Sequence, residues 1–156
     1  MDERSKYGNV PVALEFDLGR PIIHFRSKLE ARYANYLERL REVGTIMGWW
    51  YEPPTGKLRF PECLPAEWLP DFYVLTSDWN LEIHETKGLI SQKDIHKFRR
   101  AIEIEVAANI SKIVLIFARE SKKQPQLKAR AAQWVEIRYA DVLFKQVFGS
   151  SKAGVL

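Results

Sequence analysis

The feature that most constrains the fold is a pair of strand-like segments separated by a short polar turn. The segments DFYVLT (71–76) and LEIHETK (81–87) are rich in β-branched and aromatic residues, and SDWN (77–80) between them is typical of a turn. This order predicts a β-hairpin. If its turn is centred on Asp78, then Asp71 and Glu85 lie opposite each other, with Cβ atoms about 4.5–5.5 Å apart.

The second strand of this hairpin is expected to combine charged and apolar side chains on one face. Alternation along a strand places Glu85 and Lys87 on the same face as Leu81 and Ile83, whereas His84 points away from it. Two carboxylates held close together are costly unless a cation or a proton compensates their charge. Either Lys87 neutralises the pair, or a divalent metal ion lies between the carboxylates. Oxygen ligands would favour Mg²⁺ or Mn²⁺ over zinc.

Apolar residues at helical spacing predict three helices. They are expected at 27–43, with Ser27 as the N-cap and Gly44 past the end; at 91–109, where Ser91 and Asp94 form a capping signal; and at 141–148, ended by Gly149.

The remaining segments predict strands and turns. Residues 113–117 form a buried strand in this interpretation, and 134–138 a further strand. Four prolines exclude a helix from 46–68, which is expected to form short strands and turns. The first ~20 residues predict one or two short strands or an arm. Together these elements predict an α/β fold with a mixed central β-sheet flanked by helices.

Length and composition limit the function classes. The 156 residues, 46% hydrophobic and 28% charged, predict one domain (1–156) with a flexible tail at 150–156. The longest apolar run, 113–118, is too short to span a membrane, and the start lacks a signal-peptide pattern. We therefore expect a cytoplasmic protein without a membrane partner, in a bacterial or archaeal host if it is phage-encoded.

Two further classes of chemistry are excluded by the absence of their residues. The single cysteine, Cys63, rules out an intramolecular disulfide and a thiolate zinc site. No phosphate-binding loop of the G-x-x-x-x-G-K-[ST] type occurs, so no nucleotide cofactor is expected. The net charge of +4 hints at an anionic partner, and basic residues concentrate at 20–32, 87–100 and 119–130. Each of these segments is also compatible with an ordinary solvated face.

The acidic residues of the hairpin occur in a familiar pattern. Pro70-Asp71 followed by Glu85-Thr86-Lys87, with Glu30 on a preceding predicted helix, resembles the PD-(D/E)XK nuclease signature. The wider pattern is similar to phage-encoded endonucleases and archaeal-type Holliday junction resolvases, and to the subunit that cuts transposon ends in some bacterial systems. It comprises FRSKLEARYANYLE, WYEPP, WLPDFYV and LEIHETKG, within about residues 25–118. The resemblance implies a restriction-endonuclease-like core.

The resemblance also implies the roles of individual residues. Asp71 and Glu85 would bind Mg²⁺ together with the backbone carbonyl of Thr86, and Mn²⁺ is expected to substitute. Lys87 would hold the attacking water or help to deprotonate it. A metal ion lowers the pKa of a bound water and stabilises charge on the scissile phosphate.

The role of Glu30 has two interpretations. In the first, Glu30 is a further catalytic ligand, directly or through water. In the second, Ser27 and Glu30 form an S-x-x-E capping box and the carboxylate only caps the helix. Glu38, two turns further along, is the fallback acid.

Basic residues after the hairpin predict contacts with nucleic acid. Lys93, Lys97 and Arg100 follow i, i+4, i+7 spacing and are expected to form a basic stripe opposite Ile95, Phe98 and Ile102. Lys122 and Lys123 add charge further along the chain. Such residues bind phosphates with little sequence selectivity. The three histidines lack metal-ligand spacing, and the tryptophans are more typical of core or dimer contacts than of base stacking.

The expected function is that of a magnesium-dependent endodeoxyribonuclease. The preferred substrate class is branched DNA, cut by a Holliday junction resolvase that acts in recombination or replication as a homodimer. Candidates for the dimer contact are Trp49, Trp50 and 144–148. The alternatives are another DNA nuclease of the same superfamily, transposon-end or restriction-like, and a non-catalytic nucleic-acid-binding module.

Overall fold

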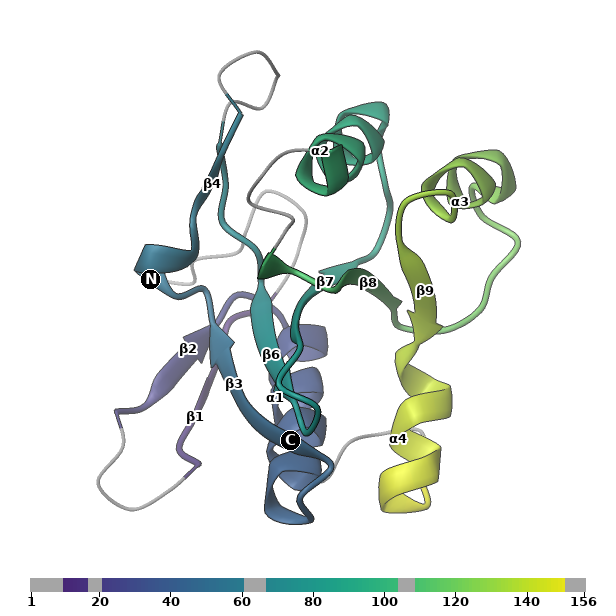
Figure 1. The fold of residues 1–156 in the computed structure, drawn as a ribbon. Coiled ribbons are helices and arrows are strands. Elements are labelled where there is room, and N and C mark those ends of the chain that lie inside the picture. Colours follow the sequence, from purple (N-terminus) through teal and green to yellow (C-terminus); the bar gives the residue numbers. More distant parts are fainter. Residues whose placement is uncertain (1–9, 17–20, 61–66, 104–108, 151–156) are drawn as a thin grey trace.

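The computed structural model describes residues 10–16, 21–60, 67–103 and 109–150, which form a mixed α/β fold (Figure 1). A five-stranded sheet has the order β3-β6-β7-β8-β9, with β3, β6 and β7 antiparallel and β7, β8 and β9 parallel. The strands are β3 (Ile46–Tyr51), β6 (Phe72–Thr76), β7 (Leu81–Lys87), β8 (Lys112–Phe117) and β9 (Glu136–Tyr139). The expected mixed central sheet is therefore confirmed.

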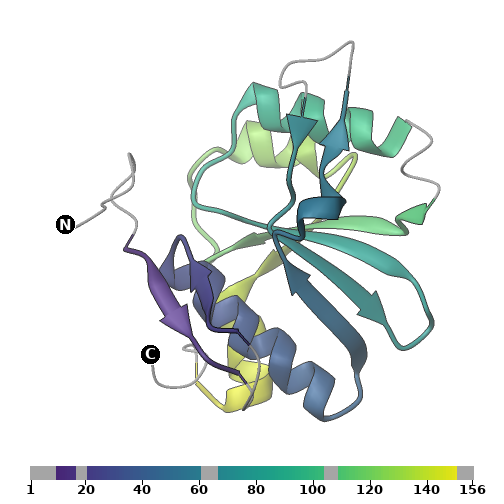
Figure 2. The same cartoon turned by 90° about the vertical axis from the view of Figure 1, so that its left-hand side faces the viewer.

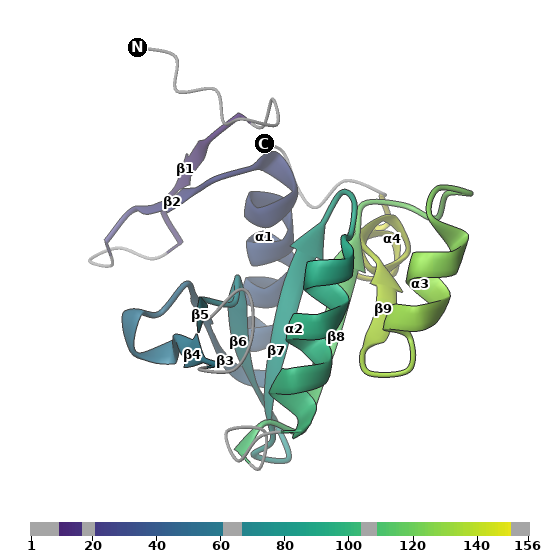
Figure 3. The same ribbon diagram turned by 90° about the horizontal axis from the view of Figure 1, so that it is seen from above.

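Helices cover both faces of this sheet. Figure 2 shows α1 (Lys28–Glu42) and α4 (Ala140–Phe148) on one side, and α2 (Gln92–Glu103) and α3 (Pro125–Ala131) on the other. In Figure 3, α2 lies along β7 and β8 with α3 beside it. None of the described helices is long and apolar enough to cross a membrane.

Two small antiparallel sheets flank the central sheet. β1 (Val12–Leu14) pairs with β2 (Ile23–Phe25) and packs against α1. β4 (Leu58–Arg59) pairs with β5 (Glu67–Trp68), after a short 3₁₀ turn at Pro54–Gly56. These elements agree with the short strands expected near the start of the chain and within 46–68.

The β6–β7 hairpin has the register that the sequence predicts. Phe72 pairs with His84 and Tyr73 with Ile83, so the turn is centred on Asp78. Continuing this register by one residue places Asp71 opposite Glu85. The hairpin therefore brings the two predicted carboxylates to the same end of the sheet.

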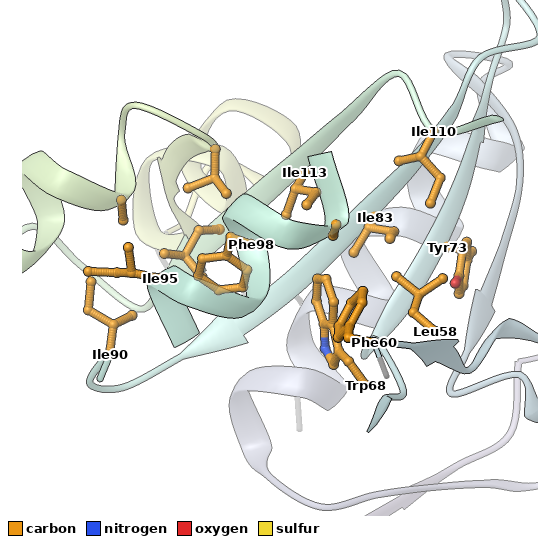
Figure 4. Close-up of a cluster of buried hydrophobic side chains, with 14 of the residues drawn as sticks. Leu58, Phe60, Trp68, Tyr73, Ile83, Ile90, Ile95, Phe98, Ile110 and Ile113 are labelled. Carbon is orange, nitrogen blue, oxygen red and sulfur yellow. The ribbon is translucent and has the colours of Figure 1, made fainter. Parts of the chain in front are cut away.

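Alternate residues of the strands pack into two separate hydrophobic cores, one on each face of the sheet. The core on the α2 side contains Phe98, Trp68 and Ile83, and Figure 4 shows these side chains in one cluster with Ile113. The core on the α1 side is built around buried aromatic and aliphatic residues of α1, α4 and the even-numbered strand positions: Tyr33, Phe72, Val74, Val114, Ile116 and Phe144. The sheet is thus buried on both faces, as expected where helices cover both sides.

The structure confirms most of the predicted elements and corrects one. The predicted helix at 27–43 is α1, capped by the Ser27 hydroxyl, and Gly44 follows it at φ +80°. The basic stretch 119–130, for which the sequence predicts no helix, forms α3 in its second half, with Pro125 in the first turn. Proline is well tolerated there because the first N–H groups of a helix have no intrahelical partner.

Some predictions fall on residues outside the described ranges. These are residues 104–108 of the predicted helix at 91–109, residues 61–66 of the segment 46–68, with Cys63 among them, residues 1–9 and 17–20 of the N-terminal segment, and residues 151–156 of the expected tail.

Three buried polar side chains are joined by hydrogen bonds within the core on the α1 side. The hydroxyl of Tyr33 lies 2.6 Å from Nδ1 of His84, and Nε2 of His84 lies 2.7 Å from Oε2 of Glu82. Burial lowers the pKa of His84, and a carboxylate only accepts, so the neutral ring donates to Glu82 and accepts from Tyr33. His84 is therefore a packing residue that faces away from Glu85, as the alternation predicts.

This hydrogen bond can be tested by Tyr33→Phe. Without the hydroxyl, Nδ1 of His84 loses its donor in a site that excludes water, which costs about 1–3 kcal/mol. We expect Tm to fall by roughly 2–10 °C in thermal unfolding followed by circular dichroism. Tyr36→Phe, on the same helix, is the control, because the Tyr36 hydroxyl makes no hydrogen bond to the described residues. Equal Tm values for the two variants would contradict the assignment.

Candidate active site

Asp71 lies at the centre of the candidate site, directly before β6, and is 2% exposed. Its Oδ2 accepts hydrogen bonds from the backbone N–H of Thr86 (2.9 Å) and from the Thr86 hydroxyl (2.8 Å). Its Oδ1 accepts from Nη2 of Arg26 at 2.9 Å. The backbone N–H of Asp71 donates to Oε2 of Glu85 at 3.0 Å. The two predicted acids are therefore in direct contact.

Glu85 extends from β7 toward α2. Its Oε2 also accepts from Nε1 of the buried Trp68 at 3.3 Å, and its Oε1 lies 3.9 Å from the ammonium groups of both Lys87 and Lys97. Burial and the nearby charge of Asp71 raise the pKa of Glu85 to about 8, because together they outweigh the two lysines. The carboxylate thus holds a proton that a stronger cation would displace.

Lys87 is held beside Glu85 by a residue of α2. Its Nζ lies 3.1 Å from Oδ1 of Asp94, whose Oδ2 accepts from the N–H (2.8 Å) and the hydroxyl (3.1 Å) of Ser91. Burial would lower the pKa of Lys87, but Glu85 and Asp94 outweigh it, so this pKa lies above the ordinary lysine value. The sequence identified Asp94 only as a cap; the structure shows that the same carboxylate also holds Lys87.

On the α1 side, three carboxylates surround one nitrogen of Arg26. Nη2 lies 2.7 Å from Oε1 of Glu52, 2.9 Å from Oδ1 of Asp71 and 3.5 Å from Oε1 of Glu30. Glu30 also accepts from the Tyr51 hydroxyl at 2.7 Å. Burial and then Asp71 raise the pKa of Glu30, as expected where acids exceed their counter-charges.

Glu30 both caps α1 and takes part in this group. Its backbone N–H donates to the Ser27 hydroxyl at 3.1 Å, and its carboxylate accepts from the backbone N–H of Arg26 at 2.9 Å. The Glu30 carboxylate thus contacts Arg26 and Tyr51 in addition to capping the helix, and its role as a metal ligand stays a prediction. The fallback acid Glu38 lies elsewhere, paired with Arg41 and accepting from Nε1 of Trp49 at 3.2 Å.

Arg26 and Glu52 are site residues that the sequence analysis missed. Both lie within the segments FRSKLE and WYEPP that carry the resemblance, but their spacing assigned them no role. Glu52 follows β3 at φ +41°, and its backbone N–H donates to the carbonyl of Asp71 at 2.8 Å. Its placement depends on the β3–β6 pairing, which the sequence did not reveal.

The predicted basic stripe on α2 is wrong in part. Lys97 is buried rather than exposed, and Ile102, expected on the buried face, is 36% exposed. The buried face of α2 consists of Ile95, Lys97, Phe98 and Ala101. Lys97 lies on this face because Glu85 and Asp94, at 3.9 and 3.4 Å, compensate its charge there.

Two other expectations concerned the aromatic residues. Phe144 belongs to the α1-side core at 2% exposure, so it is not a surface contact, whereas Trp50 is 48% exposed. Trp68 is a core residue whose indole N–H donates a hydrogen bond to Glu85.

The donor chemistry of the site fits a hard cation. Within the described ranges, no three or more histidine, cysteine, aspartate or glutamate residues are already arranged around a metal position. The carboxylates are instead compensated by Arg26 on one side and by lysines on the other. Carboxylate oxygens are nevertheless the donors that Mg²⁺ and Mn²⁺ prefer, and burial together with the charge of Asp71 raises the pKa of Glu85, so a bound cation would stabilise its ionised form.

The raised pKa of Glu85 leads to a test by pH. The folded state holds the Glu85 proton more tightly than the unfolded chain, so this stabilisation is complete below about pH 4.3, the unfolded pKa, and is lost as the pH rises toward about 8. Glu85→Gln does not titrate. In EDTA, the Tm of this variant minus that of wild type should therefore increase from pH 5 to pH 8. Glu42→Gln, on the exposed end of α1, is the control; a flat difference for Glu85→Gln would contradict the assignment.

No family model, no curated protein and no solved structure matches this chain.

Proposed function

We propose that this protein is a metal-dependent DNA endonuclease with a restriction-endonuclease-like core of the PD-(D/E)XK type. The observation that carries the proposal is the contact between buried Asp71 and Glu85 beside Lys87, on an antiparallel pair of strands. Two buried acidic residues held next to each other beside a lysine are costly for stability and are typical of functional sites. The order Asp, Glu-x-Lys along the chain matches the signature that the sequence resembles.

Four groups of this chain are proposed to hold Mg²⁺ or Mn²⁺. These are Asp71, Glu85 and the backbone carbonyl of Thr86, with Glu30 as a further ligand, directly or through water. The N–H of Thr86 points to Asp71, and the carbonyl of a strand residue points to the same side as its N–H, which supports its inclusion. A bound metal ion would activate a water molecule and stabilise charge on the scissile phosphate.

The remaining residues of the site position and compensate charge. Lys87, whose side chain is 22% exposed, is proposed to hold the attacking water or donate to the phosphate. Arg26 is 61% exposed, so its guanidinium is free to leave the carboxylates when another cation takes its place. Thr86 holds Asp71 through two hydrogen bonds and so fixes the direction of its other oxygen.

A basic cleft between α2 and α3 is proposed to bind the DNA backbone. It is lined by Lys93, His96, Arg99 and Arg130, with Trp134 at one wall, and its lining includes no acidic residue. Of the three residues of the predicted basic stripe, only Lys93 lines this cleft. Phosphates are recognised by such clusters through charge, without base selectivity.

Lys122 and Lys123 extend this positive surface toward the site. Both are exposed, in the segment that precedes α3. The neighbouring Gln124 exchanges two hydrogen bonds with the backbone of Ile90, at 2.9 and 2.8 Å, and so fixes this segment close to the end of β7.

The substrate is proposed to be a branched, four-way DNA junction, cut by a homodimer. The two-fold symmetry of such a junction requires two cuts, and one chain carries one candidate site. The exposed Trp50 and the partly exposed Trp49 and Phe148 are the aromatic candidates for a contact between copies.

The proposed chemistry is tested by Asp71→Asn. The neutral amide keeps the shape of the side chain but removes one negative charge from the metal ligands, so cleavage of a four-way junction in Mg²⁺ should fall at least 100-fold while DNA binding is retained. Wild type in EDTA should be equally inactive. Cleavage above a few per cent of the wild-type rate would refute the assigned site.

Binding without cleavage by wild type would instead favour a non-catalytic DNA-binding module. Linear duplex and single-stranded DNA, tested in parallel, decide between a junction resolvase and a less selective nuclease.

The basic cleft has its own test. Changing Lys93, Arg99 and Arg130 together to Ala should weaken duplex binding and lower the salt slope of log K by roughly 0.9 for each phosphate that the variant no longer neutralises. The control removes the same charge elsewhere, at Arg39, Arg59 and Lys145, which are exposed and do not line the cleft. If both triple variants bind duplex equally weakly, the cleft has no special role.

A further inference from the structure

Lys97 is a buried cation directed at the candidate site. Its side chain is 8% exposed, although lysine is rarely buried unless it is paired. Its ammonium lies 3.4 Å from Oδ1 of Asp94 and 3.9 Å from Oε1 of Glu85. It also lies 4.7 Å from the ring centre of Trp68, the residue whose indole N–H donates to Glu85. Such contacts with an aromatic face add to the pairing of a partly desolvated cation.

The charges on this side of the sheet form a balanced group of four. When the Glu85 carboxylate has lost its proton, Glu85 and Asp94 are both negative, and Lys87 and Lys97 are each within 4.0 Å of both acids. Asp94 is fixed by its hydrogen bonds to Ser91, so its Oδ1 faces both ammonium groups from a rigid helix end. If Lys97 were absent, Lys87 alone would compensate two carboxylates.

The two lysines differ in access to solvent. The side chain of Lys87 is 22% exposed, against 8% for Lys97. Lys87 can therefore contact a substrate, whereas the side chain of Lys97 is on the buried face of α2. This difference assigns them different tasks.

We propose that Lys97 is a positioning residue that supplies the second positive charge to Glu85 and Asp94, so that Lys87 stays available to the substrate. This inference rests on the proposed nuclease function. It assigns no DNA contact to Lys97. A merely structural side chain would act through its apolar stem, which methionine reproduces in length.

The test compares Lys97→Met with the paired variant Asp94→Asn, Lys97→Met. In the single variant Lys87 is the only ammonium group left beside Glu85 and Asp94, so it is drawn toward Asp94, and kcat for junction cleavage in Mg²⁺ should fall roughly 10–100-fold with KM nearly unchanged. The paired variant removes one charge of each sign, and kcat should recover at least fivefold over the single variant. Lys97→Arg, which keeps the charge, should also exceed Lys97→Met. Lys145→Met, at an exposed position of α4, is the control.

The same variants are also compared by thermal unfolding, a readout that does not depend on activity. In EDTA at pH 9, above the pKa of about 8 of Glu85, Lys97→Met leaves an uncompensated acid and should lower Tm by several degrees, and the paired variant should regain most of this loss. A role in DNA contact would instead raise KM without rescue by Asp94→Asn. A wild-type kcat for Lys97→Met, or a paired variant no better than the single one in kcat and Tm, would overturn the inference.

The outcome for wild type separates this inference from the proposed function. If wild type cleaves no DNA in Mg²⁺, the proposed function fails and the positioning role fails with it. If wild type cleaves but the Lys97 variants do not follow the expected order, only the role of Lys97 is refuted.

Discussion

The candidate site depends on the pairing of β6 with β7. Because the hairpin is centred on Asp78, its register ends with Asp71 opposite Glu85, and the backbone N–H of Asp71 donates directly to the Glu85 carboxylate. A shift of one residue would turn every side chain of one strand to the other face and separate the two acids. The two cores hold the register, since Phe72 and Ile83 are buried on opposite faces of the sheet.

The site compensates its negative charge differently on its two sides. On the α1 side, one exposed guanidinium is shared by Glu30, Glu52 and Asp71. On the α2 side, Glu85 faces two ammonium groups that are mostly covered. The exposed arginine is the more easily displaced of these counter-charges, because a solvated side chain loses little when it moves into water. The covered lysines form the fixed part of the site.

Helix α2 serves two purposes through its two faces. Its inner face carries Lys97 to Glu85, and its outer face presents Lys93 and Arg99 to the cleft with α3. Asp94, at its N-terminal end, caps the helix and holds Lys87. The position of this one helix therefore couples the proposed DNA-binding surface to the proposed chemistry.

The sequence by itself determined the hairpin, its register and the meeting of Asp71 with Glu85, because a short turn and period-two alternation are local properties. It also indicated the cap at Ser27 and the helix that holds Glu30. Only the tertiary structure decided the roles of Arg26, Glu52 and Lys97. Their charges are compensated by partners far along the chain, and such pairing overrides the helical pattern that placed Lys97 on the surface. The basic cleft arises in the same way, because it needs α2 and α3 side by side.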